Sequence, residues 1–173
     1  ENLTLGSFHN TNATGNELAN IILGNSGNNI LNGLAGNDHL NGNEGNDILD
    51  GGMGSDILIG GFDADTMSGG IGSDSYYVDN AGDRVTEANV AGVDKVYASV
   101  SYSISGQFIE NLTLTGTAHI NGTGNSLANA VAGNAGRNAL YGLQGNDTLN
   151  GLAGQDVLYG GDGNDRLIGG TGP

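Results

Sequence analysis

Eight aspartates that recur at nine-residue spacing are the side chains in this 173-residue sequence best suited to chemistry. Carboxylate oxygens are the ligands that hard cations such as calcium prefer, whereas zinc favours Cys and His. The chain has no Cys and only three scattered His, so its donors favour a hard cation. The aspartates form two runs: Asp38, Asp47, Asp56, Asp65 and Asp74, then Asp147, Asp156 and Asp165.

Two acids in one turn, Asp63 and Asp65, raise the alternative of acid–base catalysis. Both lie in a repeated turn that contains neither His nor Arg. A cation or solvent is therefore favoured there, and we predict that the chain has no catalytic residue and is not an enzyme.

The aspartates belong to a nine-residue repeat with three fixed positions. In twelve units, position one is Gly, position six is Asp or Asn, and position eight is apolar. A longer period of 109 residues aligns residues 1–61 with residues 110–170, with 36 identities in 61 positions. The second copy stops within a repeat, so we expect the chain to be a piece of a longer array. The units begin at Gly15, Gly24, Gly33, Gly42, Gly51, Gly60, Gly69, Gly124, Gly133, Gly142, Gly151 and Gly160.

Each unit is expected to form a six-residue turn and a three-residue strand, because Gly at positions one and four suits turns. Strand side chains alternate between faces, so position eight points inward and positions seven and nine point outward. Two units then complete one 18-residue coil of a solenoid, with two parallel sheets facing each other across the position-eight side chains. No stretch has an apolar period of 3.6 residues, so the sequence predicts an all-β fold.

Between residues 78 and 123 the nine-residue pattern is lost. Within this stretch, Lys95–Ile104 has the β-branched and aromatic content of a strand. We expect four segments: the end of a preceding connector at 1–14, a first repeat block at 15–77, a metal-free connector at 78–123 and a truncated second block at 124–173.

Stacking the coils about 4.8 Å apart would bring position-six carboxylates of alternate units together. Two unit charges about 5 Å apart repel by roughly 3 kcal/mol at an effective dielectric near 20. A solvated acidic face without metal leaves several such terms unrelieved, whereas cations between the coils would cancel them. Calcium fits an oxygen-lined turn better than magnesium, which demands near-octahedral geometry and keeps its waters.

Gly51–Ile59, Gly69–Tyr77 and Gly160–Ile168 resemble the RTX (hemolysin-type) calcium-binding nonapeptide repeat, and the likeness recurs over about two thirds of the chain. The resemblance implies a parallel β-roll with two nonapeptides per coil, in two blocks joined by a calcium-free β connector. It also implies several calcium ions, each between the turns of units i and i+2, and export by a type I secretion system.

Carried over residue by residue, the resemblance places calcium between four aspartate pairs: Asp38 and Asp56, Asp47 and Asp65, Asp56 and Asp74, and Asp147 and Asp165. It adds turn carbonyls such as those of Gly33, Ala35, Gly52 and Gly54, and leaves the partner of Asp156 beyond Pro173.

Departures from the repeat predict weaker or missing sites. Asp63 replaces the second turn Gly of its unit, which weakens the case for the Asp47–Asp65 site. Asn29 and Asn138 replace the position-six carboxylate and predict weaker sites, and the turns at 15–20 and 124–129 are expected to bind no metal.

Apolar side chains on the outer face predict contacts with something else. Outward positions hold several Ile and Leu, which suggests that the connector or a neighbouring module packs there. Tyr141 and Tyr159 lie eighteen residues apart at position nine, and cross-strand stacking is favoured over a carbohydrate-binding platform. The apolar residues are Ile21, Leu23, Ile30, Ile48, Ile57 and Ile59.

Charge and hydropathy exclude some partners. A net charge of -15 disfavours nucleic acid and anionic membranes. No apolar run approaches the roughly 20 residues of a membrane span. The partners expected are calcium ions and neighbouring modules of the same chain, with polysaccharide left open.

We therefore expect a calcium-binding structural module of a secreted or cell-surface bacterial RTX protein, which folds on calcium binding outside the cell. The 109-residue repetition favours a parent of the adhesin or surface-layer type. The alternative is a non-catalytic module of a secreted enzyme (a protease, lipase or alginate epimerase) that aids folding or binds polysaccharide.

Overall fold

The computed structural model describes residues 1–6 and 8–172 of the chain. Ser7 and Pro173, which fall in the expected end segments 1–14 and 124–173, lie outside the described residues. Every regular element in the described part is a β-strand, as the sequence predicts. These residues include no helix long and apolar enough to cross a membrane. The chain divides into two compact units, residues 1–94 and 95–173.

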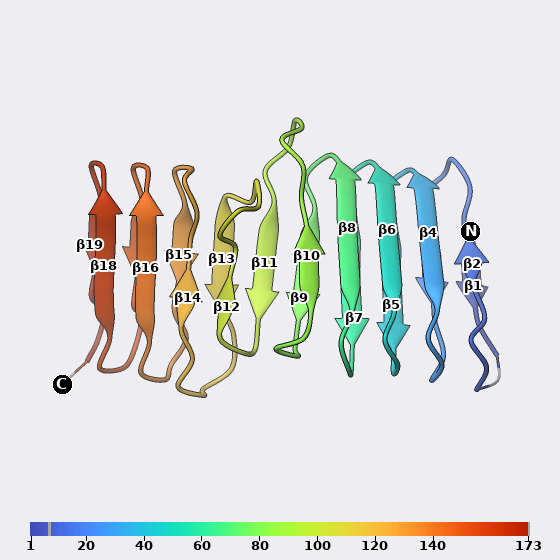
Figure 1. The fold of residues 1–173 in the computed structure, drawn as a ribbon, viewed down its shortest axis with the longest axis horizontal. Helices are drawn as coiled ribbons and strands as arrows, with labels where there is room; N and C mark the ends of the chain where they lie inside the picture. Colours follow the sequence, from blue (N-terminus) through green and yellow to red (C-terminus); the bar gives the residue numbers. More distant parts are fainter. Residues whose placement is uncertain (7, 173) are drawn as a thin grey trace. The chain divides into compact units, whose positions relative to one another are not determined.

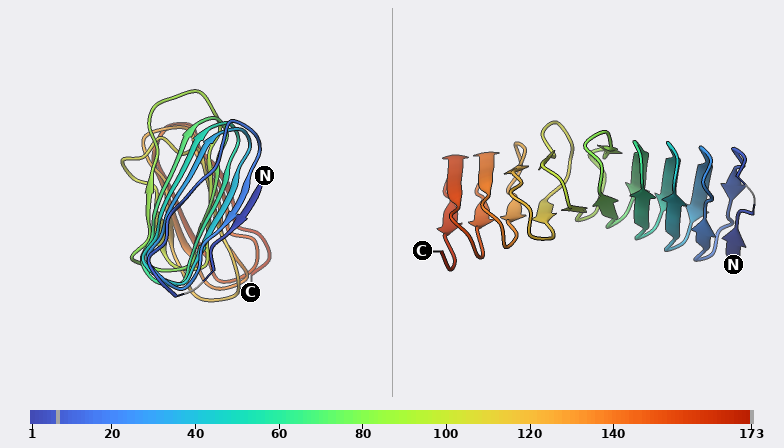
Figure 2. Two further views of the ribbon diagram at one scale, coloured as in Figure 1. Left: turned by 90° about the vertical axis from the view of Figure 1, so that its right-hand side faces the viewer. Right: turned by 90° about the horizontal axis from the view of Figure 1, so that it is seen from below.

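In the first unit, odd-numbered and even-numbered strands form two separate parallel sheets (Figure 1). One sheet runs in the order β1-β3-β5-β7-β9, and the other in the order β10-β8-β6-β4-β2. Seen from the end, the two sheets of this unit are two layers around a narrow interior (Figure 2). The strands are β1 Asn2–Thr4, β2 Ala13–Thr14, β3 Ile21–Leu23, β4 Ile30–Ala35, β5 His39–Asn43, β6 Ile48–Met53, β7 Ile57–Gly61, β8 Thr66–Ile71, β9 Ser75–Val78 and β10 Arg84–Thr86.

The second unit has the same construction. Its odd strands pair in the order β11-β13-β15-β17-β19, and its even strands in the order β12-β14-β16-β18. Lys95–Ile104, expected as one strand, forms two short strands separated by a bend. The strands are β11 Lys95–Ala98, β12 Tyr102–Ser103, β13 Asn111–Leu114, β14 Gly122–Thr123, β15 Ala130–Ala132, β16 Ala139–Gln144, β17 Thr148–Asn150, β18 Val157–Asp162 and β19 Arg166–Ile168.

Between stacked strands of the nonapeptide repeats the register is eighteen residues, which confirms two nonapeptides per coil. Leu31 pairs with Leu49, and Leu49 pairs with Met67, each in a parallel ladder. Each unit is therefore a parallel β-roll, whose interior is a single file of inward side chains from the two sheets. The roll places every position-six residue in a turn beside the same residue of the next coil.

The position-eight side chains form the core, as predicted. Ten of the twelve are 0–1% exposed, because the two sheets enclose them. Leu158, in the penultimate strand, is half-buried, and Leu167, in the last strand, is 49% exposed. The ten buried residues are Ile22, Leu31, Leu40, Leu49, Leu58, Met67, Tyr76, Val131, Leu140 and Leu149.

The strands are longer than the sequence predicts. In β4 and β6 the ladder runs through positions one to three, so that Leu34 pairs with Gly52 and Ala35 with Met53. The expectation of a six-residue turn was wrong at these coils. Stacked turns share one backbone path, so their first residues can hydrogen-bond across coils like a strand.

The outer faces carry the expected apolar residues. Ile21, Ile30, Ile48 and Ile57 are 40–49% exposed. Tyr141 and Tyr159 are register partners whose rings stack with centroids 4.9 Å apart and planes 6° apart. The predicted cross-strand stack is therefore confirmed.

Candidate metal centre

The position-six aspartates lie at the ends of the turns with their carboxylates turned into the roll. Asp38, Asp47, Asp56, Asp65, Asp74 and Asp147 are only 1–2% exposed. Asp156 and Asp165, in the last coils of the second unit, are half-buried. Ionised carboxylates are rarely buried unless something pairs with them, so each needs an account of its two oxygens.

One oxygen of each carboxylate is held by the backbone of the preceding coil. The Asp38 N–H donates to Asp56 Oδ1 at 2.7 Å, and the Asp56 N–H donates to Asp74 Oδ1 at 2.8 Å. The same bond joins Asp47 to Asp65 at 2.8 Å and Asp147 to Asp165 at 3.0 Å. The structure thus brings together all four aspartate pairs proposed from the sequence, each through a backbone donor eighteen residues earlier.

The other oxygen has no such donor. The Oδ2 atoms of seven position-six aspartates are buried and have no hydrogen-bond partner anywhere in the described part of the chain. An unmet buried acceptor costs about 1–3 kcal/mol, and more when it is charged. A repeated row of such atoms is where a cation would be held. The seven are Asp38, Asp47, Asp56, Asp65, Asp74, Asp147 and Asp156.

Glycine at position one leaves room beside each orphaned oxygen. A methyl group built on the Gly33 Cα would collide with Asp38 Oδ2 and with the carbonyl oxygen of Gly51 in the next coil. Gly51 stands in the same relation to Asp56 Oδ2 and to the Gly69 carbonyl. A carboxylate and a backbone carbonyl therefore share each of these spaces, the oxygen-only donor set that calcium takes.

The four carbonyl donors proposed from the sequence lie in this turn region. Gly33 borders the space just described, and Gly52 and Gly54 have φ of 101° and 133°, which suit Gly. Ala35 is the last residue of β4. The carbonyl that shares this space with Asp38 Oδ2 is that of Gly51, which is not among the four carbonyls proposed from the sequence. The roles of Gly33, Ala35, Gly52 and Gly54 stay predictions.

The asparagine side chains at position six find hydrogen-bond acceptors for their amide nitrogen within the roll. Asn29 Nδ2 donates to the Thr11 carbonyl at 2.8 Å, and Asn138 Nδ2 donates to the Ile120 carbonyl at 2.7 Å. The amide nitrogen thus bonds within the roll where the aspartate oxygen is left without a donor. The Asp turns, unlike these Asn turns, therefore leave a buried oxygen that a cation would satisfy.

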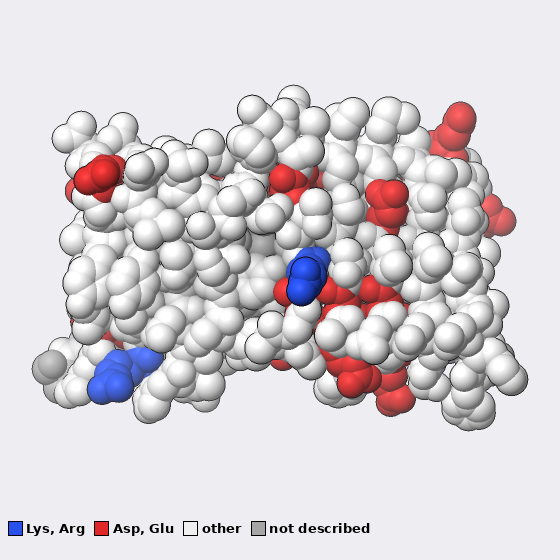
Figure 3. Space-filling view, viewed as in Figure 1, with Lys and Arg blue, Asp and Glu red and all other residues white. Residues whose placement is uncertain are grey.

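Burial of the carboxylates disfavours their charged form. Burial, together with the charges of Asp74 and Asp38, raises the pKa of Asp56 to about 6. Burial, together with the charges of Asp83, Asp47 and Asp79, raises the pKa of Asp65 to about 7. Exposed acids add to this field: the charge of Asp63 contributes to the raised pKa of Asp47, and that of Asp50 to the raised pKa of Asp56. Acidic side chains are drawn red in Figure 3.

Sequence reasoning missed three buried acids in residues 78–94. Asp83 Oδ1 accepts from the Asp65 N–H at 3.0 Å, and Asp94 Oδ1 accepts from the Asp74 N–H at 2.8 Å. Both rows of carboxylates therefore continue into the segment expected to be a connector. Asp83 follows Asp65 by eighteen residues and could have been found by spacing, whereas Asp94 follows Asp74 by twenty. The third acid, Glu87, is 4% exposed and belongs to no repeat.

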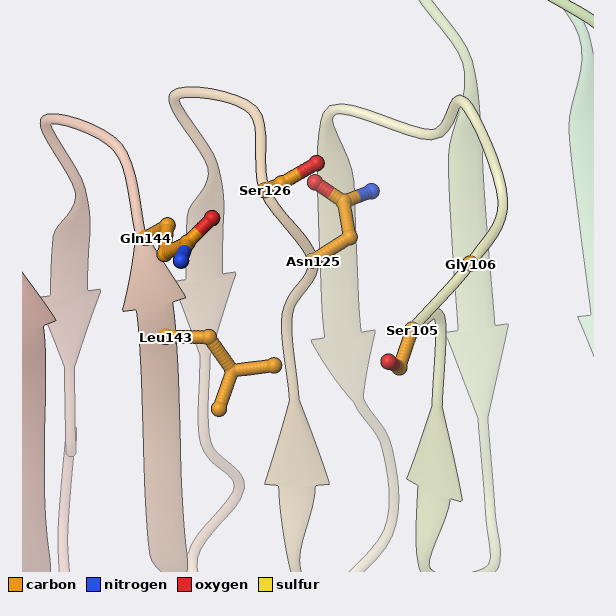
Figure 4. Close-up of a pocket in the computed structure, with 6 residues that line it drawn as sticks. All are labelled: Ser105, Gly106, Asn125, Ser126, Leu143 and Gln144. Carbon is orange, nitrogen blue, oxygen red and sulfur yellow. The ribbon is translucent and has the colours of Figure 1, made fainter.

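A shallow hollow of about 440 Å³ in the second unit offers no comparable chemistry (Figure 4). Its lining contains no acid, base or histidine that could move a proton. The aspartate turns are therefore the stronger functional candidate. The lining residues are Ser105, Gly106, Asn125, Ser126, Leu143 and Gln144.

Comparison with known proteins agrees with the geometry of the turns. A family model of the RTX calcium-binding nonapeptide repeat, built of four copies, matches overlapping stretches that cover residues 14–85 and 123–173. No curated protein matches the chain. The matched stretches contain all eight position-six aspartates.

Proposed function

The chain belongs to the family of RTX calcium-binding nonapeptide repeats, and from that premise we propose that it is a structural module of a secreted protein that folds when calcium binds its turns. The observation that carries this proposal is the set of seven buried Oδ2 atoms without a donor in the described residues. Calcium bound there would supply the positive charge that a row of buried carboxylates needs.

We assign the binding role to the aspartate pairs that the backbone bonds already join. Asp38 with Asp56, Asp56 with Asp74, Asp47 with Asp65, and Asp147 with Asp165 would each hold an ion, helped by turn carbonyls such as those of Gly33, Ala35, Gly52 and Gly54. Asp156 would take part in a further site. The Asn20 and Asn129 turns would bind none, since Asn129 Nδ2 already bonds the Ile109 carbonyl at 3.0 Å.

Coupling between binding and folding follows from the charge of the chain. Without calcium, a chain of net charge -15 with buried carboxylates resists compaction. With calcium, the free energy of ion binding becomes folding free energy. Extracellular calcium modules bind at about 0.1–1 mM, so folding would follow export through a type I secretion system.

For the parent protein we favour the adhesin or surface-layer type over a secreted enzyme. The 109-residue repetition supports an extended array, and the Ile residues exposed at 40–49% on the outer face supply a surface for neighbouring modules. In an enzyme-associated parent the same roll would be a non-catalytic module, and selective binding of alginate or another polysaccharide to the purified chain would favour that alternative.

The proposal is tested by circular dichroism during a calcium titration of the EDTA-treated chain. We expect a largely unordered spectrum in EDTA and a cooperative gain of β signal at about 0.1–1 mM calcium. Magnesium at the same concentrations and matched NaCl are the controls, and neither should give the transition. A full β spectrum in EDTA at neutral pH would refute calcium-dependent folding.

A further inference from the structure

One glycine position of the first roll carries a glutamate. In the even-numbered sheet, Gly51 and Gly69 occupy the same register position, next to the pairs Asp50–Ser68 and Gly52–Gly70. Strand β10 continues this stack, and its last pair is Thr86 with Ser68. Glu87, one residue further, therefore stands in line with Gly69, where the repeat has Gly. Its side chain is 4% exposed.

A tyrosine reaches the same place from the core. Tyr76 occupies position eight, where the other units have Leu, Ile, Val or Met, and it is fully buried. The Gly69 N–H donates to Tyr76 Oη at 2.7 Å, and the Tyr76 hydroxyl donates to Glu87 Oε2. The phenol thus fixes the Glu87 carboxylate inside the roll.

Three carboxylates meet at this point. Asp74, Glu87 and Asp94 are all buried, and one oxygen of each lies within 4.8 Å of the others. Asp94 is brought there by the bond that it accepts from the Asp74 N–H.

Asp74 supplies an independent indication of a ligand. The residue is 1% exposed, and its Oδ2 finds no hydrogen-bond donor among residues 1–6 and 8–172. A methyl group on the Gly69 Cα would collide with Asp74 Oδ2 and with Tyr76 Oη together. The unmet oxygen is therefore aimed at the place that Tyr76 and Glu87 also reach.

We propose that Asp74, Glu87 and Asp94 form a calcium site of their own kind, with three carboxylates, in which Tyr76 positions Glu87. It differs from the repeat sites because Glu87 and Asp94 lie outside the nonapeptides and Glu87 adds an acidic side chain where the repeat has Gly. An all-oxygen set with three negative charges suits calcium, and such sites bind more tightly as carboxylates are added. Of the sites in the first roll, this one should fill at the lowest calcium concentration.

Tyr76 makes the site observable separately from the others. Terbium(III) replaces calcium at oxygen sites and luminesces when a nearby tyrosine is excited. Position eight is Tyr in this unit alone, so terbium bound here should be sensitised by Tyr76. In the full chain titrated with terbium at low concentration, we expect Tyr76→Phe to remove most of the early emission. Tyr159→Phe, at an exposed tyrosine of the second unit, is the control and should leave that emission in place.

Glu87→Gln tests the ligand itself. By calorimetry with calcium, it should remove the tightest binding phase and lower the number of bound ions by one. The matched control, Glu17→Gln at an exposed position, should change neither. The proposal would be overturned if Glu87→Gln bound as many calcium ions as the wild type and kept the early terbium emission. The Tyr76–Glu87 bond would then be a buried hydrogen bond with a structural role and no metal.

The two proposals fail in distinguishable ways. Absence of calcium binding by the wild-type chain would refute the proposed function. Normal binding by the repeats with no effect of Glu87→Gln would refute only the three-carboxylate site. If Glu87→Gln does not fold, Tyr76→Phe provides the test by itself, because that substitution removes no charged ligand. Early terbium emission that persists in Tyr76→Phe would overturn the proposal.

Discussion

Aspartate and asparagine at position six differ by one atom, and that atom separates two kinds of turn. Asp47 Oδ1 accepts the Asn29 N–H of the preceding coil, whereas Asn29 Oδ1 accepts the Asn25 N–H of its own turn. Asn29 then uses Nδ2 as a donor to a carbonyl, whereas Asp47 Oδ2 stays without a donor in the part of the chain described. The Asn29 side chain is thus hydrogen-bonded at both polar atoms, whereas Asp47 keeps one oxygen for the proposed cation.

This difference predicts opposite effects of Asp56→Asn with and without calcium. Asp56 belongs to two proposed sites, so the variant should bind fewer calcium ions by calorimetry. In EDTA it should be more stable than the parent, because an amide replaces a buried charge between Asp38 and Asp74. We expect its circular dichroism spectrum in EDTA at neutral pH to retain more β signal than that of the parent, because about 1 kcal/mol changes the ratio of folded to unfolded chain several-fold.

Asp162→Asn, which removes an exposed charge from the second unit, is the matched control for that experiment. It should leave the calcium count unchanged. An unchanged ion count in Asp56→Asn would contradict the assignment of Asp56 as a ligand.

At the scale of the element, each strand separates core from surface by simple alternation. In β6, Ile48 is 49% exposed and Leu49 is 1% exposed. Leu49 lies between Leu31 and Met67 of the neighbouring coils, so its side chain is part of the file that fills the roll. The thin core gives each inward residue a large share of the stability.

Adjacent substitutions in β6 test this alternation. In saturating calcium, Leu49→Ala should lower the free energy of unfolding by about 2–5 kcal/mol, because it leaves a cavity in the roll. Ile48→Ala, one residue away, should change it by no more than about 0.5 kcal/mol. Urea denaturation of both variants makes the comparison, and equal losses would contradict the observed facing of the strand.

At the scale of the whole molecule, charge sets the response to pH. Burial raises the pKa of Asp56 to about 6 and that of Asp65 to about 7, above the ordinary value of 3.8. Between pH 4 and 7 the folded chain therefore binds more protons than the unfolded chain. Its stability without calcium must fall as pH rises through this range.

Thermal melts in EDTA at pH 5 and pH 8 check that expectation. The chain should be more ordered at pH 5, where protons neutralise the carboxylates. In saturating calcium the order should reverse, because protons compete with the ion for the same oxygens. The melts are recorded at low protein concentration, and light scattering is measured in parallel. Together they distinguish folding from precipitation near the pI of about 4.1. A metal-free chain that is equally stable at both pH values would contradict the charge argument.

Much of the fold can be predicted from the spacing of the repeats, because each coil of a roll repeats the same turn and strand. Position-eight burial, the eighteen-residue register and the Tyr141–Tyr159 stack all follow from alternation and period. Asp94 and Glu87 could not be found in this way: a two-residue insertion takes Asp94 out of register, and Glu87 stands where the repeat has Gly. The lack of a donor for the Oδ2 atoms could not be predicted from the sequence either, because only the three-dimensional structure shows which carboxylate oxygen accepts the backbone N–H.

Within the nonapeptide turns, the Oδ1 bonds run in one direction, from the N–H of one coil to the carboxylate eighteen residues later. When a coil unfolds at the C-terminal end of such a row, the remaining coil loses an acceptor and exposes a neutral N–H, which water can hydrogen-bond. When a coil unfolds at the N-terminal end, the remaining coil loses a donor and exposes a charged carboxylate. The two ends of a roll built this way should consequently unfold locally with different free energies, because one exposes an amide and the other a carboxylate.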